Sequence, residues 1–180
     1  MGQLEGKSVL LGKGTFSATE GEKYLNLFGL MDKVTIADAE LSNAGDALKN
    51  GQIDAFVSAS SWPAPNIIEA AAGTGVRILS LSDEQVEQTG QARVEIPADT
   101  YPGQTETIVT TGLPVVAFTT TAMDDETAYQ LTKDFWETRD KLAETAAWWA
   151  GVSPDQVAAI GTLHPGAKRY YDEAGVATGE

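Results

Sequence analysis

The residues with the most informative chemistry in this chain are glycines and hydroxyl side chains gathered in one short loop. The loop reads Gly-Lys-Gly-Thr-Phe-Ser-Ala-Thr and contains four candidate binding residues, Gly14, Thr15, Ser17 and Thr19. Backbone N–H groups at a helix start bind anions, and the hydroxyls and the Lys13 ammonium add further donors. The loop therefore predicts a site for a carboxylate or phosphate, although a glycine turn with an ordinary helix N-cap explains it equally well.

Two later segments place further candidates at the same edge of a predicted sheet. Ser60 and Trp62 follow a predicted strand, where hydroxyls and amides meet a ligand and an indole forms a wall. Tyr101 and Gln104 lie in a turn-rich connection and offer polar contacts to the same crevice. The alternatives are a tryptophan packed on its own loop and simple turn chemistry.

Catalysis and metal binding are poorly supported. The single histidine, His164, directly precedes a proline, and no Gly-x-Ser-x-Gly elbow occurs, so capping or packing explains this residue more simply than a catalytic role. The chain has no cysteine, and residues 124–126 lack the spacing of a calcium loop. We therefore predict a protein that is not an enzyme and that needs neither a metal nor a cofactor.

A nicotinamide-dependent oxidoreductase is the main alternative. Gly12 and Gly14 precede a predicted helix, and Asp38 ends the next strand, where a ribose-binding acid would lie. The third glycine of that fingerprint is replaced by Ser17, and no Walker-type phosphate loop is present.

The charge balance excludes several partners. With 12 Lys and Arg against 26 Asp and Glu, the formal net charge is −14, which repels nucleic acids and anionic membrane surfaces. The first seven residues lack the apolar core of a signal peptide, and no stretch is long enough to span a bilayer. If the protein is exported, we expect its signal to have been removed.

The elements that position these residues alternate between strand and helix in the first half of the chain. The predicted strands are residues 8–11, 34–37, 53–57 and 76–79. The predicted helices between them start with a Ser17–Glu20 capping box, at Ala44 and at Pro63. This order predicts an α/β fold with a mostly parallel sheet and helices on both faces.

The second half predicts strands at 107–109 and 113–119, followed by a C-terminal helical segment. Asp124 caps a long helix whose apolar stripe runs as far as Trp149, and a last helix covers 165–174.

Several segments, taken together, resemble the TAXI family of TRAP-transporter solute receptors. They are Leu-Glu-Gly-Lys at 4–7, Asp-Ala-Leu-Lys-Asn-Gly-Gln-Ile-Asp-Ala-Phe at 46–56, Thr-Tyr-Pro-Gly-Gln at 100–104 and Leu-His-Pro-Gly-Ala-Lys-Arg-Tyr-Tyr at 163–171. The ligand loop departs from the family pattern, because Phe16 stands where a small residue is usual.

The resemblance implies a type II periplasmic binding protein with two α/β lobes that close over a solute. Residues 4–104 would be the second lobe, and residues 105–180 a return strand and helices that pack on a first lobe preceding Leu4. The implied function is extracytoplasmic or periplasmic: capture of a small acidic solute, such as glutamate or 2-oxoglutarate, for the membrane subunits of a TRAP transporter. Without the first lobe, the stripe of the long helix would fold back, form a homodimer or stay exposed.

Overall fold

The structure is a computed structural model that describes residues 1–179, except for the side chain of Ala150. The chain forms two compact units, Met1–Gly112 and Leu113–Glu180, which are described separately. Short 3-10 helices connect the main elements: η1 (Gly2–Leu4), η2 (Met31–Lys33), η3 (Leu41–Asn43), η4 (Ala147–Gly151) and η5 (Pro154–Ala159).

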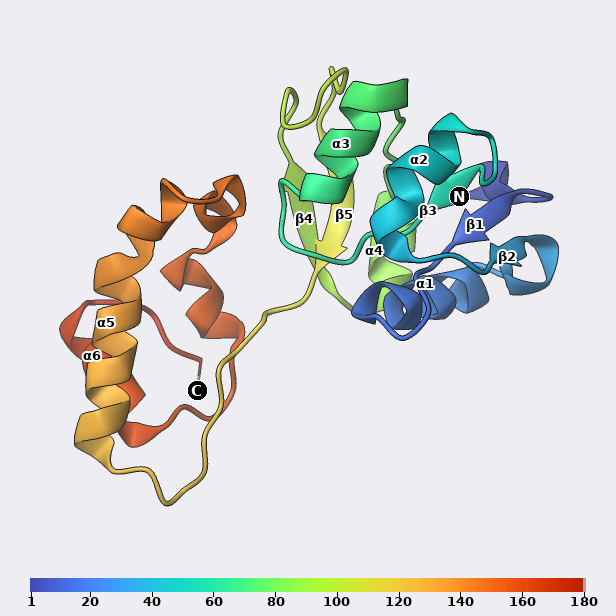
Figure 1. Cartoon of the computed structure of the whole chain (residues 1–180). Helices are drawn as coiled ribbons and strands as arrows, with labels where there is room; N and C mark the ends of the chain where they lie inside the picture. Colours follow the sequence, from blue (N-terminus) through green and yellow to red (C-terminus); the bar gives the residue numbers. More distant parts are fainter. Residues whose placement is uncertain (180) are drawn as a thin grey trace. The chain divides into compact units, whose positions relative to one another are not determined.

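A three-stranded parallel sheet forms the centre of the first unit. Strand β1 (Ser8–Leu10) lies between β2 (Thr35–Ala37) and β3 (Ala55–Phe56), and Val9 is in register with Ile36. All three strands therefore end at the same edge of the sheet (Figure 1). The loops that follow them are brought together there.

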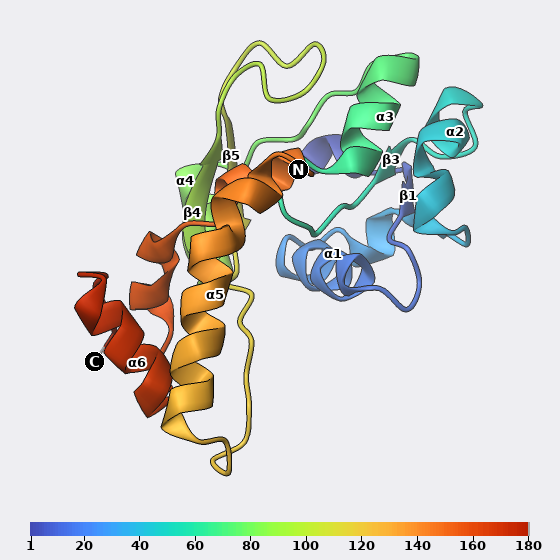
Figure 2. The ribbon, with the colours of Figure 1, turned by 60° about the vertical axis from the view of Figure 1, so that its left-hand side comes forward.

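Helices cover both faces of this sheet, as the alternation of side chains along β1 requires. Val9 points into a cluster with α1 (Phe16–Leu27), while Leu10 points into a separate cluster with α2 (Ala44–Lys49). Helix α3 (Pro65–Thr74) packs on α2, on the side opposite α1 (Figure 2). The predicted α/β class, with a parallel sheet and helices on both faces, is confirmed.

The last elements of the first unit differ from the prediction. Residues 76–79 form no strand, and the helix predicted from Pro63 begins at Pro65. The segment instead leads to α4 (Asp83–Thr89), which starts with a capping box. An antiparallel ribbon of β4 (Ala92–Ile96) and β5 (Ile108–Gly112) then completes the unit.

The N-cap of α1 also differs from the prediction. Thr15, not Ser17, caps this helix, because the Thr15 hydroxyl oxygen accepts a hydrogen bond from the N–H of Ala18 at 3.3 Å. Ser17 lies in the first turn, and its buried hydroxyl is used in a tertiary contact.

The second unit is helical. Helix α5 (Asp125–Ala143) is capped by Asp124, as predicted, but ends before Trp149, which lies in η4. Helix α6 (Pro165–Glu173) packs along α5. The predicted strand at 113–119 is wrong: within the described chain, these residues pair with no strand.

Aromatic and charged side chains join α5 to α6. The Arg169 guanidinium lies 4.1 Å from the centre of the Tyr129 ring and forms an ion pair with Glu126 at 2.8 Å. The indole N–H of Trp136 donates to the hydroxyl of Tyr171 at 3.2 Å. None of the helices in the described part of the chain combines the length and apolar character needed to cross a bilayer.

Candidate functional site

A pocket of about 370 Å³ lies where the loops after β1, β2 and β3 meet. Its lining residues come from those three loops and from the starts of α1 and α3: Thr15, Phe16, Ser17, Leu41, Ser58, Ala59, Ser60, Pro65 and Asn66. In open α/β sheets, the carboxyl edge of the strands is the usual place for a ligand. The pocket therefore occupies the position at which the sequence predicts binding.

The first turn of α1 supplies hydrogen-bond donors to this pocket. The N–H of Ala18 is taken by Thr15, and the Thr15 hydroxyl itself donates to the carbonyl oxygen of Gly12 at 2.6 Å. Within the described chain, the backbone N–H groups of Phe16 and Ser17 have no acceptor. These two amides carry the partial positive charge of the helix start, which favours an anionic group.

Ser17 adds a third donor and also fixes the geometry of the pocket. Its side chain is buried, with the residue only 5% exposed, and its Oγ accepts a hydrogen bond from the N–H of Ala59 at 2.9 Å. The hydroxyl proton has no acceptor among the described residues, so it is available to a ligand. One side chain thus holds the loop after β3 against α1 and offers a donor to the pocket.

The opposite wall consists of short polar side chains that bond to one another. The Ser58 hydroxyl donates to Oδ1 of Asn66 at 3.2 Å, and the Ser60 hydroxyl donates to the carbonyl oxygen of Ser61 at 3.2 Å. The Asn66 amide nitrogen makes no hydrogen bond within the described residues and is a further donor. Among the described residues that line the pocket, none is charged.

Of the predicted binding residues, Thr15, Ser17 and Ser60 line the pocket, whereas five others do not. Gly14 forms the exposed turn before α1, and Thr19 is exposed one turn further along this helix. Trp62 packs against the core cluster that contains Tyr101. Phe16, Ser58 and Asn66 also line the pocket, although none of them is among the predicted binding residues. Ser58 belongs to the segment after a predicted strand whose hydroxyls the sequence places at this edge, and that position was the available signal.

Tyr101 and Gln104 use their polar groups inside the protein. The Tyr101 hydroxyl accepts from the N–H of Ala64 at 2.9 Å, and burial raises the pKa of this phenol. Oε1 of Gln104 accepts from the N–H of Tyr101 at 3.2 Å, and its amide nitrogen donates to the carbonyl oxygens of Pro97 and Glu106, both at 2.9 Å. These contacts shape the connection between β4 and β5.

In a dinucleotide-binding fingerprint, the third glycine normally allows the helix to approach the sheet closely. In this chain, the close approach occurs at a different residue. A Cβ atom on Gly21 would lie 2.8 Å from the Leu11 side chain and 3.2 Å from Val57. Gly21 therefore permits α1 to pack tightly on the sheet one turn after Ser17, and the start of α1 keeps its hydroxyl.

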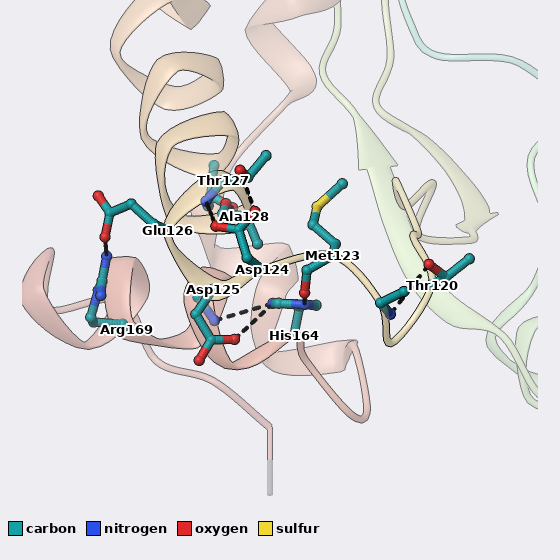
Figure 3. A network of polar contacts seen from close by, with 12 residues as sticks. Thr120, Met123, Asp124, Asp125, Glu126, Thr127, Ala128, His164 and Arg169 are labelled. Carbon is teal, nitrogen blue, oxygen red and sulfur yellow. Dashed lines mark hydrogen bonds and ion pairs between the residues drawn. The ribbon is translucent and has the colours of Figure 1, made fainter.

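His164 has a structural role in the second unit. Its Nδ1 accepts from the N–H of Gly166 at 3.2 Å, capping α6, and its Nε2 is 3.2 Å from the carbonyl oxygen of Met123 (Figure 3). Because Nδ1 is the acceptor, Nε2 carries the proton and donates to Met123. The capping role predicted for His164 is confirmed.

An α/β unit that offers unpaired amide and hydroxyl donors in a pocket at the carboxyl edge of its sheet is typical of a ligand-binding domain. Comparison with known families agrees, because the NMT1-like family matches residues 1–175. The chain belongs to the NMT1-like family, a periplasmic-binding-protein-like family of binding proteins.

Proposed function

We propose that this protein is an extracytoplasmic solute-binding protein that holds the carboxylate of a small acidic solute and delivers the solute to a TRAP transporter. The observation that carries the proposal is the set of three donors in one pocket: the N–H groups of Phe16 and Ser17 and the hydroxyl of Ser17. The motifs shared with TAXI receptors support the link to a TRAP membrane subunit. Glutamate and 2-oxoglutarate are the first solutes to test.

The donors match the task of reversible capture. Hydrogen bonds to an ionised group are stronger than those between neutral groups, so two amides and a hydroxyl suffice to orient one carboxylate. Among the described residues of the lining, none is a general base that could activate the Ser17 hydroxyl as a nucleophile, so the donors hold a solute without changing its bonds. This supports a binding protein over an oxidoreductase.

We further propose that residues 4–104 act as one lobe of the receptor and that residues 105–180 form a return segment that packs on another lobe. The exposed apolar side chains of α5, Leu131 at 56% and Phe135 at 42%, support such a contact. Sedimentation of the chain alone tests whether this stripe instead forms a homodimer, since a homodimer would sediment with twice the mass of the chain.

A single lobe supplies only part of a binding site, because the second wall normally completes the contacts and excludes water. We therefore expect millimolar rather than micromolar affinity for this chain. Chemical-shift titration of the ¹⁵N-labelled protein measures affinities in that range and locates them. The proposal expects acetate, glutamate or 2-oxoglutarate to shift the amide signals of Phe16, Ser17 and Ala59.

The control is Ser42→Ala, which changes an exposed serine of η3 outside the pocket lining. This variant keeps the same shifts, whereas Ser17→Ala weakens them. If no carboxylate perturbs the Phe16 and Ser17 amides at concentrations up to tens of millimolar, the proposed site is wrong.

A further inference from the structure

We propose that the solute is a monocarboxylate with an apolar body, and that Phe16 is the residue that selects this body. The inference rests on the proposed function, because it assigns the remainder of the molecule whose carboxylate the α1 donors hold. The acidic solute is thereby narrowed to one class, and an exposed apolar side chain of the lining receives a role in recognition.

The lining offers no charged partner for a second carboxylate. Among its described residues none is a lysine or arginine, and the donors beyond those of α1 are neutral, chiefly the backbone N–H and the side-chain amide of Asn66 at the start of α3. Removing a second ionised carboxylate from water without a charged partner is costly, so this lobe disfavours a dicarboxylate.

Phe16 lies beside these donors. It is the first residue of α1, so its backbone N–H is one of the unpaired donors, and the residue is 55% exposed and lines the pocket. The α1 core does not contain it, since the cluster on that face is formed by residues such as Leu25 and Leu11. The ring is therefore an apolar surface directly beside the carboxylate donors.

Further apolar side chains complete the lining around Phe16. Leu41 and Pro65 join Phe16 in the lining, and they come from different loops. A pocket of about 370 Å³ is at the lower end of the range for ligand sites, which suits a carboxylate with a short branched or ring-shaped body. Apolar groups covered by such a body strengthen binding by about tenfold for every 50–60 Å² removed from water.

The test compares four probes by chemical-shift titration of the full chain: acetate, 4-methylpentanoate, 2-oxoglutarate and 4-methylpentanol. We expect 4-methylpentanoate to bind about tenfold more tightly than acetate and 2-oxoglutarate, and to shift the ring signals of Phe16. The alcohol, which lacks the carboxylate, should bind more weakly than 4-methylpentanoate.

The variant is Phe16→Ser, and its matched control is Leu27→Ser, which removes an exposed apolar side chain, 42% exposed, at the other end of α1. Phe16→Ser should reduce the affinity for 4-methylpentanoate about tenfold more than it reduces the affinity for acetate, while Leu27→Ser should change neither affinity. Thermal melting of both variants verifies that they remain folded.

Two failures are distinguishable. If acetate and 2-oxoglutarate shift the Phe16 and Ser17 amides but 4-methylpentanoate binds no better, or Phe16→Ser binds it as well as the parent, the inference on the apolar body is overturned and the site stands. If none of the carboxylates perturbs these amides, the proposed function and the inference fail together.

Discussion

The substitution Ser17→Ala separates the two roles that the structure gives to one hydroxyl. Among the described residues, Ser17 Oγ is the only acceptor for the N–H of Ala59, at 2.9 Å, and Ser17 is 5% exposed. Removing one partner of a buried hydrogen bond leaves the other unsatisfied and costs about 1–3 kcal/mol. For a unit of this size, we expect the melting temperature to fall by roughly 5–15 °C.

The same substitution removes a donor from the proposed carboxylate site. A hydrogen bond to an ionised group contributes about 1.5–3 kcal/mol, so the affinity for 4-methylpentanoate or acetate should fall at least about tenfold. Thermal melting by circular dichroism reports the first effect, and chemical-shift titration below the melting transition reports the second. Ser42→Ala, at an exposed serine of η3, controls for the loss of a hydroxyl as such.

The two readouts refute different steps. If Ser17→Ala melts at the same temperature as Ser42→Ala, the hydroxyl does not hold the loop after β3. If Ser17→Ala is less stable but binds carboxylates as tightly as the parent protein, the assignment of its proton to the ligand is wrong.

Two further predictions concern the second unit. Gly166→Ala should destabilise the packing of α6 on α5 by about 3 kcal/mol or more, because a Cβ atom there would collide with the backbone carbonyl of Asp125. The control Gly161→Ala has open space around its Cβ atom and should leave the stability unchanged. Urea unfolding followed by tryptophan fluorescence measures both variants, and equal midpoints would refute this packing. The Thr127 hydroxyl and, as the second cause, the Thr127 backbone N–H donate hydrogen bonds that lower the pKa of Asp124. The Asp124 carboxylate therefore stabilises the fold at pH values above the ordinary carboxyl pKa, and this stabilisation is lost as the pH falls through the lowered pKa. The stability difference between the parent and Asp124→Asn should therefore shrink from pH 7 to pH 3 in urea titrations, and a constant difference would contradict the assignment.

Local patterns predicted the elements whose structure depends on nearby residues. The apolar run at 8–11 became β1, whose alternation places Val9 and Leu10 on opposite faces, and Asp124 caps α5 through a residue three positions away. In such cases, the alternation of side chains along a strand or the geometry of a helix cap depends only on residues within a few positions. The α/β class followed from these elements.

Elements that depend on distant partners were less predictable. Residues 113–119 have strong β propensity, but a strand also requires a partner, and the described chain provides none there. Strand β4 (Ala92–Ile96) is short and alternates apolar residues with the charged Arg93 and Glu95, and its pairing with β5 defines it.

The candidate site shows the same limit. Thr15 and Ser17 are both suitable N-caps by residue type. The Ser17 hydroxyl oxygen instead accepts a hydrogen bond from the N–H of Ala59, 42 positions away, and Thr15 caps the helix. Tyr101 and Gln104 have suitable side chains for a ligand, but neighbouring backbone groups already satisfy them. Sequence patterns could identify the edge of the sheet, while the competition between partners there required coordinates.

The neutral lining of the pocket bears on how the protein would take up and release a solute. With a net charge of −14, the chain as a whole repels an anion at long range, and within the described lining no cation opposes that field; the nearest charge along the loop, Lys13, is exposed to water. On the proposed function, affinity would come from short-range hydrogen bonds and from apolar contact with Phe16, both of which depend on exclusion of water. We therefore propose that strong binding requires a second wall over the site, so that closure, rather than charge attraction, controls capture.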